Sequence, residues 1–164
     1  MDTRLRALAG RQGGTFSVHE VMRLGVDHAE LRRAVRDSEL VCVRRGAYVV
    51  GSRWREASAD ERYRLKATAV ARTRPEDGLS HHAALAVHGL PLWDHDLGRV
   101  DLVSGVRQAV NRGGIWLHPA AGVELTDVGG VQAVPVARAV VRTALTMGTA
   151  AAVVAGDAAL HSGL

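Results

Sequence analysis

The segment SVHEVMRLGVDHAELRRAVRDSELVCVRRGAYVV, residues 17–50, decides how the rest of the chain is interpreted. Ser17 and Glu20 have the spacing of a capping box, in which each residue satisfies a free backbone N–H at a helix start. Asp27 and Glu30 repeat this signature after a glycine that is suited to end the first helix. Two short helices joined by a tight glycine turn predict a helix-turn-helix.

Two short β-prone runs follow the second helix. Leu40–Val43 and Ala47–Val50 flank the tripeptide Arg44-Arg45-Gly46, which predicts a hairpin, the wing of a winged helix. The second helix leaves basic side chains outside its apolar face, and the hairpin tip adds two more arginines. The predicted DNA-contacting residues are His28, Arg32, Arg33, Arg36, Arg44 and Arg45.

Charge is unevenly distributed along the chain. Residues 1–55 hold 11 arginines against 6 acidic residues, a balance of +5, whereas residues 56–164 hold 10 basic and 11 acidic residues, a balance of −1. The positive field therefore coincides with the helix-turn-helix, which favours DNA binding over a merely solvated surface. The alternative is a winged helix that binds a partner protein and no DNA.

The remaining sequence predicts a second, mixed domain after a polar connector over Ser52–Ser58. The predicted helices outside the helix-turn-helix are Thr3–Arg11, Asp60–Arg72, His81–Leu90, Pro135–Thr146 and Ala150–His161. The predicted strands of the second domain are Val100–Val103, Ile115–Leu117 and Gly130–Val134. The fold class is therefore expected to be α+β, with a winged helix-turn-helix over residues 1–55 and a small α+β domain over residues 56–164.

The composition excludes several classes of protein. The single cysteine, Cys42, allows no internal disulfide and is expected to be a core residue of the wing rather than a nucleophile. No apolar run approaches the roughly 20 residues that a membrane span requires, and the first residues do not resemble a secretory signal. These features predict a cytoplasmic protein.

Histidines between residues 81 and 95 raise the question of a metal site. His81 and His88 share a helix face but lie about 10.5 Å apart along it, which is too far for one ion, and His82 points elsewhere. The sequence instead predicts that Ser80-His81 caps the helix and that His88 packs near its end. We therefore expect no metal site and no cofactor.

Asp94-His95-Asp96 resembles the carboxylate pair of a two-metal nucleotidyltransferase. Such enzymes place a Gly-Ser turn shortly before their Asp-x-Asp, whereas Gly51-Ser52 lies far upstream on the wing strand. The sequence also has no nucleophile elbow and no phosphate-binding loop. The triplet is expected to be a polar loop, and the protein is expected not to be an enzyme.

With these elements placed, the chain resembles the AbiEi-type antitoxin family of bacterial abortive-infection systems, the type IV toxin–antitoxin systems, in its actinobacterial form. The resemblance rests on an ordered set of four pieces that spans most of the chain. They are ALAGRQGGTFSVHEVMRLGV (7–26), VRRGAYVV (43–50), LSHHAALAVHGLPLW (79–93) and VQAVPVARAVVRTAL (131–145).

This resemblance implies a function. In the family, the winged helix binds inverted repeats in double-stranded DNA upstream of its own operon and represses transcription. The second domain neutralises a nucleotidyltransferase-like toxin without a tight complex. For this chain the resemblance implies a recognition helix over Asp27–Asp37, with Arg32, Arg33 and Arg36 on DNA, and structural roles for Gly46 and Tyr48. A monomer or a weak homodimer is expected.

The sequence departs from many relatives after Leu160. Those relatives continue into a nuclease-like domain that resembles very-short-patch-repair endonucleases, whereas the sequence up to Leu164 has no acidic–lysine motif of that kind. It is expected to be either a short family member or a truncated product. The second alternative is therefore that the chain is the targeting half of a nuclease fusion. The operator, the toxin and the oligomeric state on DNA are not encoded in any recognisable motif.

Overall fold

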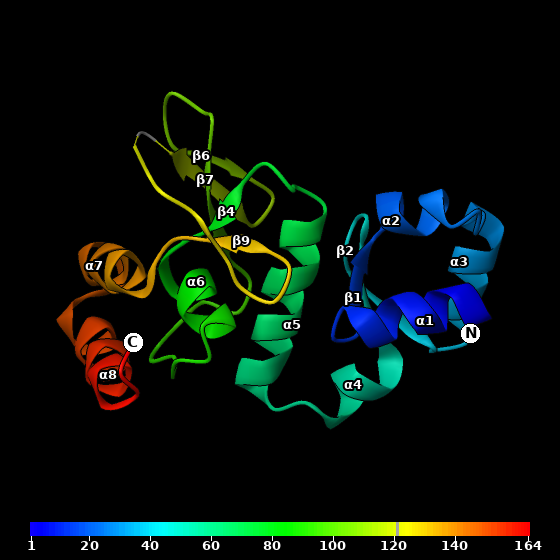
Figure 1. The fold of residues 1–164 in the computed structure, drawn as a ribbon, viewed down its shortest axis with the longest axis horizontal. Coiled ribbons are helices and arrows are strands. Elements are labelled where there is room, and N and C mark those ends of the chain that lie inside the picture. Colours follow the sequence, from blue (N-terminus) through cyan, green and yellow to red (C-terminus); the bar gives the residue numbers. More distant parts are fainter. Residues whose placement is uncertain (121) are drawn as a thin grey trace. The chain divides into compact units, whose positions relative to one another are not determined.

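The computed structural model describes residues 1–120 and 122–164, which form two compact units, Met1–Arg74 and Pro75–Leu164 (Figure 1). The elements of the first unit are α1 (Thr3–Arg11), β1 (Thr15–Ser17), α2 (Val18–Arg23), α3 (His28–Arg36), β2 (Leu40–Arg44), β3 (Ala47–Val50), α4 (Gly51–Glu56) and α5 (Ala59–Arg72). Those of the second unit are β4 (Gly78–Leu79), α6 (His81–Val87), β5 (Val100–Ser104), β6 (Val110–Arg112), β7 (Ile115–Pro119), β8 (Thr126–Asp127), β9 (Gln132–Ala133), α7 (Val136–Met147) and α8 (Thr149–His161).

The first unit is a winged helix-turn-helix, and the predicted α+β fold class is confirmed. Its helices α1, α2 and α3 are followed by the β2–β3 hairpin, and its antiparallel sheet has the strand order β1-β3-β2. Both predicted capping boxes are present, one at Ser17 and Glu20 and the other at Asp27 and Glu30. Gly25, between the two helices, has a φ of +73°, which a residue with a side chain rarely adopts. Local sequence signals therefore set the boundaries of both helices.

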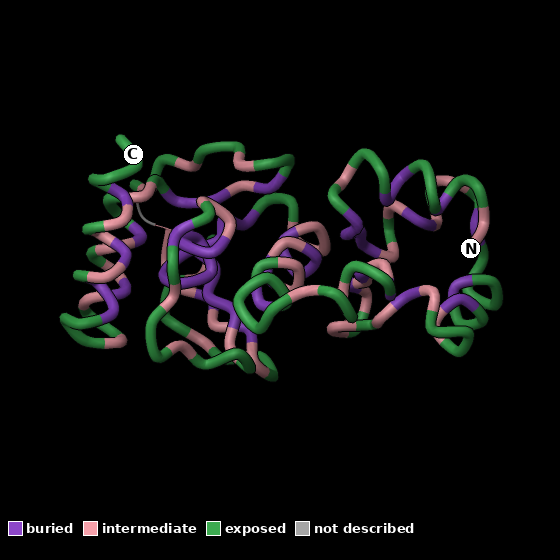
Figure 2. Tube along the Cα trace, turned by 90° about the horizontal axis from the view of Figure 1, so that it is seen from below, coloured by how far each residue is buried: buried purple, intermediate pink, exposed green. Residues whose placement is uncertain are grey.

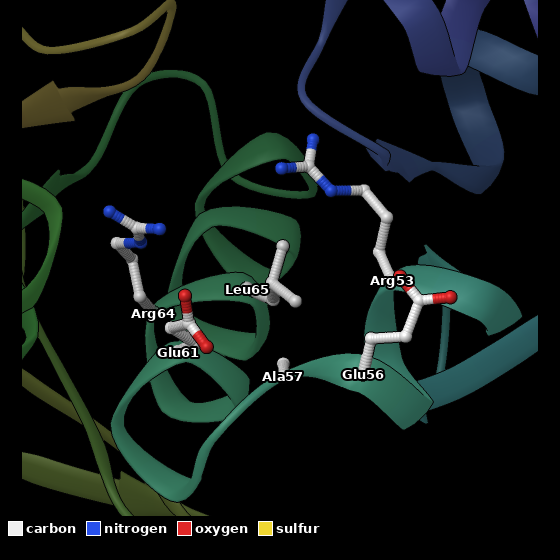
Figure 3. A pocket seen from close by; sticks show the side chains of 6 residues that line it. All are labelled: Arg53, Glu56, Ala57, Glu61, Arg64 and Leu65. Carbon is white, nitrogen blue, oxygen red and sulfur yellow. The ribbon is translucent and has the colours of Figure 1, made fainter.

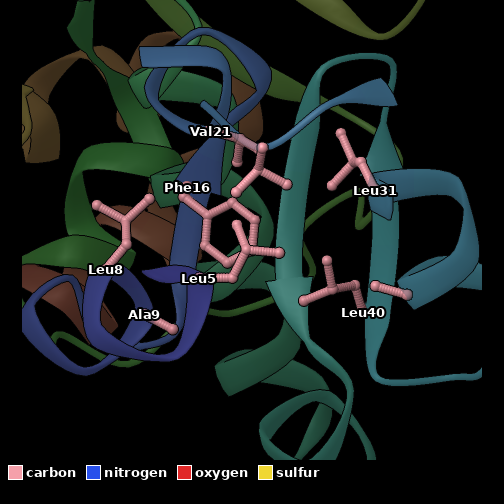
Figure 4. Packing of buried hydrophobic residues seen from close by; sticks show 9 residues of the cluster. Leu5, Leu8, Ala9, Phe16, Val21, Leu31 and Leu40 are labelled. Carbon is pink, nitrogen blue, oxygen red and sulfur yellow. The ribbon is translucent and has the colours of Figure 1, made fainter. Parts of the chain in front are cut away.

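Phe16 is at the centre of the first hydrophobic core (Figure 4). Its side chain is fully buried, and its ring stacks on that of Tyr48, with ring centroids 6.2 Å apart. Figure 2 shows how buried and exposed stretches alternate along the helices around it. The apolar side chains that pack in this cluster are Leu5, Leu8, Ala9, Val21, Val26, Leu31, Ala34 and Leu40. The three helices thus cover one face of the sheet.

The opposite face of the sheet is covered by α5. Thr15 in β1 and Val49 in β3 alternate with the residues that face the core, yet both are fully buried. Helix α5 contacts β1 and β3, and its predicted apolar face of Tyr63, Ala67 and Val70 is buried. The helix belongs to the first compact unit for this reason. The first unit ends at Arg74, whereas the sequence predicted a domain boundary at residue 55.

Residues 52–58, expected to be a polar connector, are mostly helical, so that prediction was wrong. Helix α4 spans Gly51–Glu56 directly after β3, with no spacer between them. Two of its arginines bind backbone carbonyls distant in sequence: Arg53 Nη1 donates to Gly13 at 2.8 Å, and Arg55 Nη1 donates to Ser38 at 3.0 Å. Such tertiary contacts stabilise a short helix that has no apolar periodicity of its own.

Cys42 is exposed, and its assignment to the core was also wrong. Cys42 is two residues after the buried Leu40 in β2, so both side chains are on the same face of the sheet. Within β2 only Leu40 is buried and Cys42 is exposed, so the core covers the start of the strand but does not reach Cys42. The alternation of side chains along a strand predicts which face a residue is on, but not how far the core extends along the strand.

The second unit contains a mixed sheet, which has six strands within the described residues, in the order β6-β7-β5-β4-β9-β8. Strands β5 and β7 are parallel, as are β4 and β9. Helix α6 contacts β5 and α7, and α7 packs on α8. The three predicted strands are confirmed as β5, β7 and β9, whereas β4, β6 and β8 were not predicted because two or three residues show no period. No helix in the described part of the chain is long and apolar enough to cross a membrane.

Candidate nucleic-acid interface

Helix α3 presents a row of basic side chains to solvent. Its buried residues, Leu31 and Ala34, fix which side of the helix faces the core. Residues four apart in an α-helix are neighbours on its surface, so His28, Arg32 and Arg36 form one continuous row. All three side chains are exposed. The row lies beside the buried stripe, on the side of the helix that carries no acidic residue.

Arg33 is exposed too, but its surroundings differ. It lies about 100° farther round the helix than Arg32. The shallow depression that Arg33 lines also contains four acidic residues, Asp2, Glu30, Asp37 and Glu39. The charge of Arg33 is therefore partly offset by its neighbours. Arg32, on the other side of α3, interacts electrostatically with the Asp27 cap.

The exposed arginines of α3 and of the wing turn have no hydrogen-bond or ion-pair partner within the described residues. Arg32, Arg33 and Arg36 on α3 and Arg45 in the hairpin make no hydrogen bond and no ion pair with any residue in the described ranges 1–120 and 122–164. A surface arginine without an internal partner keeps all five of its N–H donors available for a ligand. This distinguishes them from Arg4, which bonds to Asp2 and to the carbonyl of Leu24.

The start of α3 is held by Asp27. Its carboxylate accepts hydrogen bonds from the backbone N–H groups of Ala29 and Glu30, at 2.7 and 2.8 Å. These bonds lower the pKa of Asp27 below its ordinary value, so the cap is anionic at neutral pH. In return, the Glu30 carboxylate accepts from the backbone N–H of Asp27. The basic row therefore begins at a fixed helix end.

The wing is fixed to the start of α2 by a backbone contact. The carbonyl of Gly46 accepts a hydrogen bond of 2.8 Å from the backbone N–H of Val18. Gly46 has a φ of +81°, and a Cβ added there would lie 3.3 Å from Cγ1 of Val18. Arg45 at the turn is exposed, whereas Arg44 at the end of β2 is half-buried. The contacts of Gly46 and Tyr48 agree with the structural roles expected for them.

Residues 4–51 match the family described as "Transcriptional regulator, AbiEi antitoxin". This segment belongs to that family. The match covers the AbiEi-type winged helix from α1 to the end of β3 and includes α3 and the β2–β3 hairpin. It places the AbiEi-type segment among DNA-binding regulators of toxin–antitoxin systems. A comparison of the chain with curated proteins found no match.

Two other features of the protein offer no comparable interface. Asp94, His95 and Asp96 lie in a segment without helix or strand, as expected for a polar loop. A depression between α4 and α5 is lined by two arginines and two glutamates beside short apolar side chains (Figure 3). Its charges balance, so it selects neither an anion nor a cation. The residues that line it are Arg53, Glu56, Ala57, Glu61, Arg64 and Leu65.

The histidines of α6 do not all behave as expected. Ser80 precedes the helix, but its side chain makes no capping hydrogen bond, so the predicted cap was wrong. Its hydroxyl is buried and has no hydrogen-bond partner among the described residues. His88 Nε2 lies 3.0 Å from the carbonyl oxygen of Val134, at hydrogen-bonding distance, which fits the expected packing near the helix end. His81, by contrast, faces two residues of the sheet that the sequence did not connect with it.

Proposed function

We propose that this protein is an antitoxin-type repressor that binds inverted repeats in the double-stranded DNA of its own promoter. In this proposal α3 enters the major groove, with Arg32, Arg33 and Arg36 on base edges and His28 at the helix start. Arg44 and Arg45 contact the DNA backbone or the minor groove from the wing. The protein performs no catalysis in this role and acts in the cytoplasm as a monomer or a weak homodimer.

The single observation that carries the proposal is the exposed row of His28, Arg32 and Arg36 on the second helix of an AbiEi-type winged helix. A helix-turn-helix reads sequence through side chains near the start of this helix. Arginine donates two parallel hydrogen bonds to guanine, and each such pair contributes about 1–3 kcal/mol of discrimination. The two arginines of the row are one helical turn apart, a spacing suited to adjacent base pairs.

The antitoxin role rests on the family. The family that residues 4–51 match is described as an antitoxin as well as a transcriptional regulator. We propose that the protein counteracts a nucleotidyltransferase-like toxin encoded beside it, without forming a tight complex with that toxin. Induced expression of the neighbouring gene should arrest growth, and co-expression of this chain should restore it. Purification of the chain from the rescued cells should not retain the toxin.

Fluorescence anisotropy with a labelled duplex tests the DNA-binding proposal. The full chain is titrated into its own upstream DNA and into a scrambled duplex, each at two salt concentrations. Tighter binding to the upstream duplex is expected, with a loss of about 100-fold or more in Arg32→Ala/Arg36→Ala, since two base contacts are removed. The matched control is Arg64→Ala, which removes an exposed arginine from α5 and should leave the affinity unchanged.

Other outcomes contradict the proposal. Equal, weak and salt-sensitive binding to both duplexes would mean that the row is only an electrostatic surface. The absence of any salt-dependent binding would favour the alternative of a winged helix that recognises a protein. An equal loss of affinity in Arg64→Ala would show that total charge, rather than the row on α3, determines binding.

A further inference from the structure

Three potential metal ligands from different elements of the second unit lie close together. They are His81, the first residue of α6, Asp101 in β5 and His118 in β7. One ligand atom of each lies within 4.8 Å of those of the other two. The spacing of histidines along one helix did not predict this cluster.

The sheet explains why these residues meet. Strands β5 and β7 are parallel neighbours in which Val103 pairs with His118 and Asp101 pairs with Trp116. Residues two apart on a strand share a face, so Asp101 and His118 are on the same side of the sheet. Helix α6 contacts β5, which brings His81 to Asp101. Three distant parts of the chain thus supply one nitrogen or oxygen ligand each.

Asp101 is a charged group in a fully buried position. Its Oδ1 is 2.6 Å from His118 Nε2, and Arg99 donates to both carboxylate oxygens, at 2.6 and 2.7 Å. Burial alone would raise the pKa of Asp101, but the hydrogen bonds from His118 and Arg99 lower it to about 2. The Arg99 guanidinium also lies 4.6 Å from the ring centre of Trp116. The carboxylate is therefore anionic and held in one orientation.

His81 supplies an unused nitrogen. Its side chain is only 3% exposed, and its Nδ1 lies 3.9 Å from Oδ1 of Asp101, which is too long for a hydrogen bond. Nδ1 has no hydrogen-bond partner among residues 1–120 and 122–164. Burial lowers the pKa of His81 to about 3, so the imidazole is neutral at physiological pH. Its φ of +51° is unusual for a residue with a side chain. Buried polar nitrogens normally have a hydrogen-bond partner, and Nδ1 of His81 has none within the described residues.

We propose that His81, Asp101 and His118 form a site for one divalent transition-metal ion of the zinc type. Tetrahedral coordination at about 2.0–2.1 Å separates ligand atoms by about 3.3 Å. The two distances from Asp101 Oδ1, 3.9 Å to His81 and 2.6 Å to His118, lie on either side of that value. Small side-chain shifts therefore suffice. On binding, neutral His118 carries its ring proton on Nδ1 instead of Nε2, which leaves Nε2 and the Oδ1 lone pair that it now uses available to the ion. Solvent takes the fourth position.

The ligand atoms and the neighbouring charge of Arg99 determine which class of metal ion the site would bind. Arg99 offsets the negative charge of Asp101 and keeps its two hydrogen bonds as an outer partner of the ligating carboxylate. Mg²⁺ and Ca²⁺ prefer several oxygen ligands, whereas this site offers two imidazole nitrogens and one oxygen. Two histidines and one carboxylate are the ligand set of zinc, cobalt and ferrous ions. The proposal concerns the second unit and is independent of DNA binding.

Cobalt absorption tests the site directly. The untagged full chain is freed of metal with a chelator. It is then titrated with Co²⁺ while the visible absorption spectrum of the protein solution is recorded. One Co²⁺ per chain with intense bands is expected, and one equivalent of Zn²⁺ should remove them. His118→Ala and His81→Ala should weaken binding at least 10-fold. His161→Ala, which removes an exposed histidine from α8, is the matched control and should bind normally.

A second readout keeps the test valid if a variant unfolds. His118 is half-buried, so its replacement is less damaging than that of His81, and circular dichroism verifies that each variant is folded. Zn²⁺ should raise the melting temperature of the wild type and of His161→Ala but not of folded His118→Ala. The proposal fails if the folded wild type binds no Co²⁺ saturably. It also fails if folded His118→Ala binds with unchanged affinity, or if His161→Ala loses binding.

Discussion

The guanidinium Nε of Arg72, near the end of α5, donates a hydrogen bond of 3.0 Å to the hydroxyl of Thr15 in β1. Arg72 Nη1 also lies 3.9 Å from the Glu20 carboxylate, which forms the capping box of α2. The Arg72 side chain is only 7% exposed, so water competes little for these contacts. One residue of α5 thus holds both the sheet and the first helix of the helix-turn-helix.

Arg72→Ala should destabilise the first unit by about 1–3 kcal/mol, because it leaves the buried hydroxyl of Thr15 and the half-buried carboxylate of Glu20 without their charged partner. Urea unfolding followed by circular dichroism measures this loss as a lower transition midpoint. Arg64→Ala is the matched control on the same helix, since Arg64 is exposed and the change in helix propensity is identical. Equal midpoints for the two variants would show that the buried contacts add no stability.

Truncation should locate the end of the winged-helix unit. A chain of residues 1–74 should unfold cooperatively, whereas residues 1–55 should not, because removal of α5 exposes the sheet face that contains Thr15, Ala47 and Val49. Thermal unfolding of the two fragments, followed at 222 nm, distinguishes them. A cooperative transition for residues 1–55 would support the earlier boundary predicted from the sequence.

The helix-turn-helix could be predicted because its signals are local. A capping box uses residues three apart, and a glycine at a left-handed turn acts within one residue of the helix end. The side on which α5 packs, by contrast, depends on the pairing of β1 with β3, and β1 is too short to show a period. The sequence therefore predicted α5 as a helix but assigned it to the other domain.

The histidine and aspartate cluster was missed for a related reason. His81 and His118 become neighbours only through the packing of α6 on β5 together with the parallel pairing of β5 with β7, which no local pattern encodes. One signal was available: Asp101 lies within an apolar strand, between Val100 and Leu102. A carboxylate in such a strand requires a partner when both faces of the sheet are covered. The spacing of residues along a single helix does not indicate which residues of neighbouring strands lie close by.

Gly51 should not tolerate a side chain. A Cβ added there would lie 2.2 Å from the carbonyl oxygen of Ser38 and 3.1 Å from that of Glu39. Gly51→Ala should therefore destabilise the first unit by about 1–3 kcal/mol, since backbone must move. Gly10→Ala is the control: nothing lies within 4 Å of its Cβ, and alanine is the better helix former. A melting temperature for Gly51→Ala as high as that of Gly10→Ala would contradict this close approach.

The arginines of α3 should differ in their contribution to DNA binding. Arg36→Ala is expected to weaken binding to the upstream duplex about 10-fold or more, because Arg36 belongs to the exposed row. Arg33→Ala should have a smaller effect, because Arg33 lies beside Glu30, Asp37 and Glu39. Anisotropy titrations of both variants at one salt concentration give the ranking. A larger loss for Arg33→Ala would mean that the opposite side of α3 enters the groove.

The wing should contribute through charge rather than sequence. Arg45 is exposed at the hairpin turn, so Arg45→Ala should weaken binding to the upstream and the scrambled duplex by the same factor. The slope of log K against log salt should become shallower by about 0.9 for the lost phosphate contact. Titrations at four salt concentrations measure the slope, and Arg64→Ala supplies the reference. An unchanged slope in Arg45→Ala would remove Arg45 from the proposed DNA interface, and a loss confined to the upstream duplex would instead assign Arg45 to base recognition.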